Sequence, residues 1–223
     1  MIETTSRRAT LLALPAALAA GASAFAQQAQ PPFQVTPPGD ATPRPIPAER
    51  FVGREDAPVT VIEYHSLTCG NCARFHNEIF PRIKRAFVEP GLVRFALRDF
   101  PLDRVALDAA AAAHCAGPER FEALISTFYV NKETWAHAQD PRAWLRRTTQ
   151  LAGVPAERLE ACWSDRGFLD PIVQSRLEGT RQFGVDATPS FVIGGRLHRG
   201  VLTFERFSEL VRPLLPAGTA PRG

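Results

Sequence analysis

The hydrophobic and polar positions of this 223-residue chain follow a strand-like pattern first and a helical pattern next. A β-branched and aromatic run from Val59 to Tyr64 predicts a buried strand. Apolar residues then recur at every fourth position on one helical face: Phe75, Ile79, Ile83 and Phe87. We expect Pro81 to kink this helix and Gly91 to end it, before a second strand from Leu92 to Leu97. Strand, helix and strand predict a parallel βαβ unit.

The next region, residues 103–168, carries helical periodicity and no strand signal. A break near Gly117–Pro118 separates two helices, and Asp140 followed by Pro141 has the pattern of an N-cap and a first helical residue. Another helical pattern runs from about Leu169 to Phe183. An all-helical block is therefore predicted after the βαβ unit.

The last part of the chain returns to strand patterns. Ser190 to Ile193 predicts a strand, Gly194–Gly195 a hairpin turn, and Arg196 to Arg199 the return strand. Thr203 is expected to cap a final amphipathic helix.

This order of elements, β-α-β, helices, then α-β-β-α, is that of the thioredoxin fold, an α/β fold, with an inserted all-helical domain. We predict a thioredoxin-like domain from residues 51–102 and 169–216 and the inserted helical domain at 103–168.

Residues 1–26 have the pattern of a secretory signal peptide, with Arg7 and Arg8 before an Ala/Leu run and small residues before a cleavage site after Ala26. The arginine pair also resembles a twin-arginine export signal, and both export routes stay open. Residues 27–50 are rich in Pro and Gln and predict an extended linker. Either route predicts export to the periplasm.

Charge adds little to this picture. The formal net charge of +3 is spread along the chain, without a basic run or an interleaved aromatic motif of the kind that binds nucleic acid. Most charged residues are expected on solvated helix faces. We therefore expect no nucleic-acid partner.

Four cysteines follow the signal peptide: Cys69, Cys72, Cys115 and Cys162. An even number in an exported chain favours disulfides, although a domain of this size does not need them to fold. Cys69 falls at the N-terminal edge of the first helix, where unpaired N–H groups and the helix dipole lower the pKa of a thiol. Cys69 is therefore the predicted nucleophile, and Cys72, one turn further in, is expected to resolve the mixed disulfide.

The strand TVIEYHSLT, the motif CGNC at 69–72 and the segment GVDATPSFVIGG together resemble the DsbA-like branch of the thioredoxin superfamily. The resemblance covers nearly the whole mature domain. It implies an exported thiol:disulfide oxidoreductase that transfers the Cys69–Cys72 disulfide to thiols of folding client proteins. The dithiol is then the redox group, no other cofactor is expected, and a membrane redox partner is compatible with this activity.

The same resemblance implies a cis peptide bond before Pro189, beside the reactive pair. Thr188 would then present its backbone to an extended client peptide, next to Gly70 and Asn71 between the cysteines. An ordinary proline before a strand is the alternative. The resemblance also implies that Glu63 is a buried acid that relays protons for Cys72, and its alternative is an exposed position on an alternating strand.

The chain departs from the family pattern between the cysteines. The best-known DsbA enzymes have Pro-His there, whereas this chain has Gly70 and Asn71. An asparagine can donate a hydrogen bond to sulfur but supplies no positive charge, so a milder oxidant is expected. The sequence therefore leaves an isomerase or reductase open beside the oxidase. The absence of a recognisable dimerisation domain favours a monomeric oxidase.

Cys115 and Cys162 lie 47 residues apart in the predicted helical block. They resemble the second cysteine pair of alphaproteobacterial DsbA relatives, which implies a structural disulfide. Neither has a Cys-x-x-Cys partner at a helix start, which also favours a structural role. A regulatory disulfide that tunes Cys69 is the alternative.

A non-catalytic Cu(I) or zinc protein is the hypothesis from another class. His65, Cys69, Cys72 and His76 are close in sequence and have the ligand types for these metals, but their spacing on one helix start does not favour a tetrahedral site. No metal is therefore expected. The other histidines are predicted at the surface: His114, His137 and His198. The tryptophans are predicted to pack the core of the helical block: Trp135, Trp144 and Trp163.

Overall fold

The computed structural model describes residues 50–218 and Met1. Apart from Met1 and Arg50, the predicted signal peptide (1–26) and the predicted linker (27–50) lie outside the described residues. Residues 50–218 belong to one compact unit. None of the helices in this part of the chain has the length and apolar character needed to span a bilayer.

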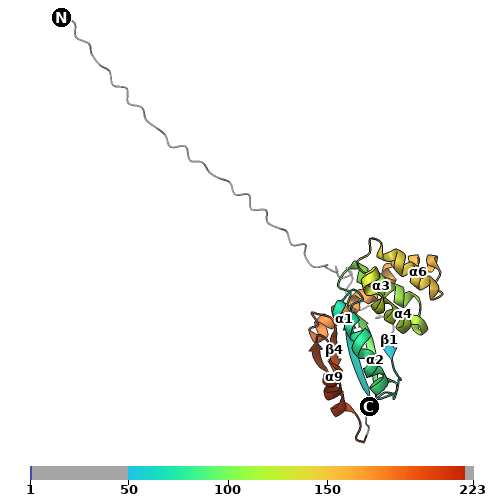
Figure 1. Ribbon diagram of the computed structural model, residues 1–223, viewed down its shortest axis with the longest axis vertical. Coiled ribbons are helices and arrows are strands. Elements are labelled where there is room, and N and C mark those ends of the chain that lie inside the picture. Colours follow the sequence, from blue (N-terminus) through green and yellow to red (C-terminus); the bar gives the residue numbers. More distant parts are fainter. Residues whose placement is uncertain (2–49, 219–223) are drawn as a thin grey trace. The chain divides into compact units, whose positions relative to one another are not determined.

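A five-stranded mixed sheet runs through this unit (Figure 1). Its strands are β1 (Arg50–Val52), β2 (Val59–His65), β3 (Val93–Asp99), β4 (Ser190–Ile193) and β5 (Arg196–Arg199). Their order in the sheet is β1-β3-β2-β4-β5, with β2 and β3 parallel and the other neighbours antiparallel. The predicted parallel βαβ unit and the C-terminal hairpin are confirmed.

Two features of the sheet differ from the prediction. Strand β1 has no counterpart in the sequence pattern, because three residues are too few to show an alternation. It pairs with β3 and forms one edge of the sheet. Strand β3 begins at Val93 and runs to Asp99, beyond the predicted end at Leu97. This extension places Asp99 opposite His65 of β2.

The helical stretch after β2 is a series of regular and wide turns. It consists of α1 (Gly70–Arg74), the π-helical turn η1 (Phe75–Ile79), α2 (Phe80–Ile83) and the π-helical turn η2 (Lys84–Val88). Pro81 lies in the first turn of α2, where a missing N–H is tolerated. The expected interruption at Pro81 therefore takes the form of a wide turn before it. Phe75, Ile83 and Phe87 are fully buried, as their spacing predicts.

The other helices of the described residues all follow β3. They are α3 (Arg104–Cys115), α4 (Pro118–Val130), α5 (Lys132–Trp135), α6 (Pro141–Leu151), α7 (Ala156–Ser164), α8 (Arg166–Glu178), η3 (Gly179–Phe183), α9 (Phe204–Val211) and η4 (Arg212–Leu214). The side chains of Asp140 and Thr203 accept backbone hydrogen bonds at the starts of α6 and α9, as predicted. Helix α8 begins at Arg166, three residues before the predicted start at Leu169.

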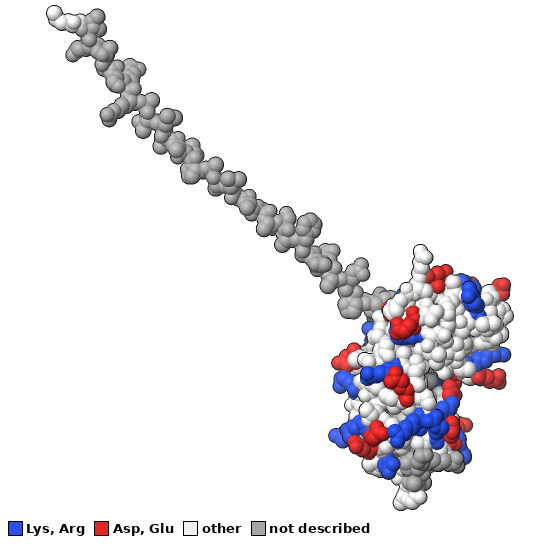
Figure 2. Space-filling model, in the orientation of Figure 1, with Lys and Arg blue, Asp and Glu red and all other residues white. Residues whose placement is uncertain are grey.

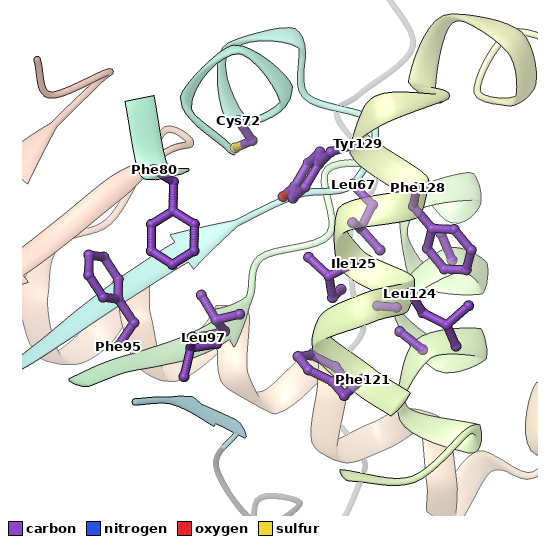
Figure 3. Close-up of a cluster of buried hydrophobic side chains, with 14 of the residues drawn as sticks. Leu67, Cys72, Phe80, Phe95, Leu97, Phe121, Leu124, Ile125, Phe128 and Tyr129 are labelled. Carbon is purple, nitrogen blue, oxygen red and sulfur yellow. The ribbon is translucent and has the colours of Figure 1, made fainter. Parts of the chain in front are cut away.

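The helices between β3 and β4 share one hydrophobic core with the sheet. Figure 3 shows Ile125 of α4 on the side of the helix that faces Leu97 of β3. The tryptophans lie in this core as predicted, with Trp135 and Trp163 buried and Trp144 stacked on Trp135 at 5.9 Å between ring centroids. The helical insertion is therefore continuous in packing with the thioredoxin-like part.

The two edges of the sheet are short or polar. At one edge β1 has three residues, and at the other β5 has the sequence RLHR with exposed Arg196 and Arg199. The turn before β5 uses Gly194 and Gly195 at φ of 56° and 76°, which L side chains rarely adopt. Figure 2 shows basic and acidic side chains interspersed over the visible face, in line with the dispersed charge of the sequence.

Candidate active site

The two cysteines of the CGNC motif occupy the junction between β2 and α1. Cys69 is the N-cap of α1, with extended backbone, and Cys72 lies inside the first turn. The Cys69 N–H donates to the carbonyl of Ser66 at 3.1 Å, and Thr68 Oγ1 donates to Asp103 Oδ2 at 2.7 Å. These bonds hold the loop so that Cys69 is half-buried and Cys72 is fully buried.

The Thr188–Pro189 loop lies beside this junction, although Thr188 is 119 residues beyond Cys69 in the chain. Its peptide bond is cis, as the resemblance implies, and both residues are buried. The Cys69 thiol donates to the carbonyl of Thr188 at 3.3 Å. The carbonyl of Pro189 accepts a bond from the Gly200 N–H at 2.8 Å, which ties the loop to the end of the hairpin. The loop therefore has a fixed position beside the nucleophilic sulfur.

The electrostatic environments of the two thiols are opposite. The pKa of Cys69 is lowered to about 5, chiefly because the Cys72 thiol donates a hydrogen bond to it, with further contributions from Thr188 and the backbone N–H groups of Cys72 and Asn71. Burial acts against this shift but does not outweigh it. The pKa of Cys72 is raised, mainly by its own burial and then by Cys69 and Glu63. At neutral pH Cys69 is thus the thiolate and Cys72 the thiol.

Glu63 is fully buried on β2, so the alternative of an exposed position on an alternating strand is wrong. Its Oε1 accepts a hydrogen bond from His76 Nε2 at 3.0 Å, while its Oε2 has no hydrogen-bond partner among the described residues. The role of Glu63 in proton transfer stays a prediction.

A buried polar network lies beside Glu63 and His76, and it was not predicted from the sequence. His65 Nδ1 and the Tyr129 hydroxyl are 2.8 Å apart, and His65 Nε2 lies 4.0 Å from Asp99 Oδ1. His114 Nε2 donates to Asp99 Oδ2 at 2.6 Å. Burial lowers the pKa of His65, whereas the pKa of Asp99 is lowered because His114 outweighs the opposing effect of burial.

The prediction that His114 lies at the surface is therefore wrong. The residue is 8% exposed, on α3, and is held there by Asp99. Its partner is 15 residues away in sequence and belongs to a strand that extends further than the pattern indicated. His137 is exposed and His198 partly exposed, as predicted.

The histidines of the alternative metal hypothesis do not converge with the cysteines. Among the described residues, no group of three or more His, Cys, Asp or Glu side chains is arranged to hold a metal ion. His65 and His76 are 6.1 Å apart between ring centroids and bond to Tyr129 and Glu63 respectively.

The positions between the cysteines are open to solvent. Gly70 and Asn71 are both exposed. A methyl group placed on Gly70 would lie 4.0 Å from Lys132 Cε of α5. Lys132 is buried, and its ammonium pairs with Glu133 at 2.8 Å. This neighbour was not predicted, because Lys132 is 62 residues beyond Gly70 in the chain.

The second cysteine pair forms a disulfide. Cys115, the last residue of α3, is bonded to Cys162 of α7, with 6.2 Å between their Cα atoms. Cys115 is buried and Cys162 half-buried. The bond joins the last residue of α3 to an interior residue of α7, so neither cysteine belongs to the first turn of a helix.

A strand, a Cys-x-x-Cys helix start and a cis-proline loop on one sheet define a thioredoxin-like protein, and the family model described as Thioredoxin matches residues 46–212. The chain therefore belongs to the thioredoxin family.

The comparisons with individual proteins identify the branch. The chain is 28% identical over 148 residues to a "Putative protein-disulfide oxidoreductase" of Rickettsia bellii, covering 66% of this chain and 57% of that protein. A protein of the same name from Rickettsia felis is 31% identical over 153 residues, covering 66% and 53%. The crystal structure of alpha-DsbA1 from Wolbachia pipientis has a TM-score of 0.70 at 28% identity, covering 76% of this chain and 92% of that one. These likenesses place it among the DsbA-like members. The chain spans little more than half the length of the curated relatives it matches.

Proposed function

We propose that this chain is an exported thiol:disulfide oxidoreductase that transfers the Cys69–Cys72 disulfide to cysteine thiols of folding client proteins. The observation that carries the proposal is the opposite environment of the two sulfurs: a half-buried Cys69 with a pKa lowered to about 5, and a buried Cys72 with a raised pKa. Its partial exposure makes Cys69 the sulfur that a client thiolate can reach, and its stable thiolate makes it a good leaving group in the second step.

The transfer has two steps. A client thiolate attacks Cys69 Sγ, the Cys69–Cys72 bond breaks, and the released electron pair stays on Cys72 Sγ, which takes up a proton from Glu63. A second client thiolate then attacks the client sulfur of the mixed disulfide, and Cys69 leaves as its thiolate. The client is oxidised and the protein is reduced by the same two electrons.

Client binding is assigned to the surface around Cys69. The backbone at Thr188 and Pro189 would pair with an extended client segment, since the Thr188 carbonyl already lies 3.3 Å from the nucleophilic sulfur. Gly70 and Asn71 are exposed beside it and leave room for the client chain. We assign Cys115–Cys162 a structural role in the helical domain.

The proposed setting follows from this activity. Residues 1–26 would direct export, 27–50 would link to the thioredoxin-like domain (51–102 and 169–216), and 103–168 would form its helical insertion. The protein would work in the periplasm as a monomer on unfolded clients. A membrane redox partner would reoxidise the dithiol, with no other cofactor and no nucleic acid involved.

The reduction potential of Cys69–Cys72 tests the direction of transfer. It is measured in glutathione buffers on the mature protein, with Cys115 and Cys162 intact and with both changed to Ser. A value of about −120 to −180 mV supports the oxidase. A value of about −270 mV favours a reductase or isomerase that uses the same pair. A difference between the two forms would give the second pair a regulatory role.

The Cu(I) or zinc hypothesis has a separate test. Protein purified without oxidation is assayed for metal content. Stoichiometric metal that Cys69→Ser abolishes would replace the oxidoreductase proposal, whereas metal-free protein with client-oxidising activity supports it.

A further inference from the structure

A cavity of about 140 Å³ lies between the helical stretch after the cysteines and helix α4. Lys84 and Glu122, whose side chains form an ion pair and are 37% and 45% exposed, belong to its lining and place it at the surface. Ser126 adds a hydroxyl to its lining and His76 an imidazole. A cavity of this size with polar groups in its lining is large enough for water.

His76 connects this cavity to the interior of the site. Its side chain is 6% exposed, and its Nε2–H donates to Glu63 Oε1 at 3.0 Å. Tyr129 of α4 stacks on the ring at 4.4 Å between centroids and 18° between planes, which fixes the orientation of the imidazole. One buried ring therefore has Glu63 as its hydrogen-bond partner and also lines a cavity that opens to solvent.

Glu63 in turn lies within electrostatic reach of Cys72. Its charge contributes to raising the pKa of that thiol, after burial and Cys69. Cys72 and His76 are four residues apart on one helical stretch, which puts them on neighbouring turns of the same side. Because Glu63 is fully buried, a proton can travel between this carboxyl group and solvent only through a neighbour.

We propose that His76 is a positioning residue that passes a proton between Glu63 and the solvent in this cavity. The inference rests on the proposed function, because only a working dithiol requires Cys72 to gain and lose a proton. When the Cys69–Cys72 bond breaks, Cys72 Sγ takes a proton from Glu63, His76 returns one to Glu63, and solvent returns one to the imidazole. When the disulfide is formed again, each proton moves in the opposite direction.

Several titratable groups lie around His76, and a variant that tests the role of His76 has to leave these residues unchanged. They are Glu63 and His65 on β2, Tyr129 and Glu122 on α4, Lys84 on η2, and Cys72 on α1. Substitution of His76 alone leaves all of them in place. A change in the pH profile of Cys72 reactivity is then attributable to the imidazole.

The experiment follows each cysteine separately in one reaction. Mature protein in which Cys69 and Cys72 are reduced and the Cys115–Cys162 disulfide is intact is mixed with the chromogenic disulfide DTNB. Cys69 attacks the reagent and releases a first chromophore, and Cys72 then attacks the mixed disulfide and releases a second. Cys115 and Cys162 do not react because they are joined in a disulfide. The first release reports the Cys69 thiolate, and the second requires Cys72 to lose its proton.

Two variants separate proton transfer from packing. His76→Phe keeps a ring for Tyr129 but has no nitrogen, and His76→Gln keeps an N–H donor for Glu63 but has no imidazole. At pH 7 both should slow the second release by about 10- to 100-fold and leave the first within about twofold. Their second rate should rise with hydroxide concentration more steeply than that of the wild type. His137→Phe, at an exposed histidine, is the matched control and should change neither rate.

A second release in His76→Phe within about twofold of wild type overturns the relay. A second release at the wild-type rate in His76→Gln also overturns the relay, because a hydrogen bond to Glu63 without an imidazole would then suffice for the reaction of Cys72. Loss of both releases together would indicate misfolding of that variant, and the relay is then decided on the other one. The failure of the proposed function looks different: the wild-type protein itself would give no second release, or Cys69→Ser would still give the first.

Discussion

Cys69 and Cys72 are free thiols within one helical turn of each other, whereas Cys115 and Cys162 are 47 residues apart and joined in a disulfide between α3 and α7. The first pair lies at a helix N-terminus beside a cis-proline loop and a buried acid. The second pair joins the end of α3 to the interior of α7, with Cys115 in the hydrophobic core and Cys162 packed against it. On the proposed function, these different surroundings assign thiol–disulfide exchange to the first pair and a structural role to the second.

The largest expected effect is on activity at the first pair. Cys69→Ser should reduce the rate of oxidising a reduced, unfolded client by about 1,000-fold or more, because no other sulfur is a thiolate at neutral pH. Cys72→Ser should still form a mixed disulfide with the client and then stall. Non-reducing electrophoresis and client refolding rates check both. Full activity of Cys69→Ser would show that the nucleophile has been assigned wrongly.

The next effect is on stability at the second pair. Changing Cys115 and Cys162 to Ser together should lower the free energy of unfolding by about 4 kcal/mol, the chain-entropy value for a loop of this length. The rate of client oxidation should stay within about twofold. Urea unfolding of the oxidised proteins gives the first quantity, and the client assay gives the second. A double variant that keeps its stability but has altered activity would give the second pair a regulatory role in place of a structural one.

A third test compares the alkylation rates of Cys69 and Cys72 as a function of pH. Alkylation of Cys69 in the reduced protein should titrate with a midpoint at its pKa of about 5, while Cys72 stays about 100-fold less reactive at pH 7. The folded pKa of Cys69 is below the unfolded value of about 8.5, so its contribution to stability is complete above about pH 8.5 and is lost as pH falls through about 5. Urea unfolding of reduced wild type and Cys69→Ser across this range measures it. If the difference in the free energy of unfolding between the two proteins stays constant with pH, the lowered pKa of Cys69 is contradicted.

The smallest effect concerns the residue between the cysteines. Asn71→His should raise the reduction potential by about 30 mV, equivalent to a tenfold change in the equilibrium, because an imidazolium stabilises the Cys69 thiolate. The exposed position of Asn71 keeps the effect modest. Gln150→His, at an exposed site on α6, is the control and should not change the potential. An unchanged potential in Asn71→His would mean that Lys132 or the backbone already dominates the charge around Cys69.

The local part of the site could be predicted from the sequence. The strand before Cys69, the helix start, the hairpin and the T-P segment each have a short-range pattern, and the structure brings them to one place. These features depend on periodicity, turn residues and the position of a thiol on a helix, which are all encoded within about ten residues.

The buried polar network could not be predicted in this way. His65, Asp99, His114 and Tyr129 make their contacts across 15 to 64 positions of the chain. A single histidine in a helical pattern is most often exposed, and the partner that buries it is not visible locally. Strand β1 was missed for a related reason, since it is defined only by its pairing with β3. Sequence reasoning therefore locates the sulfurs better than the buried polar groups around them.

The short β1 and the arginines of β5 have a consequence for a protein that meets unfolded chains. An open sheet edge is a template on which any extended segment can add a strand, and aggregation begins in this way. Here one edge strand, β1, has three residues within the described part of the chain, and the other, β5, presents the guanidinium groups of Arg196 and Arg199, of which Arg199 is held by Asp186. On the proposed function, such edges discourage clients from extending the sheet at its margins. The backbone beside Thr188 is then the place proposed for an extended client to dock.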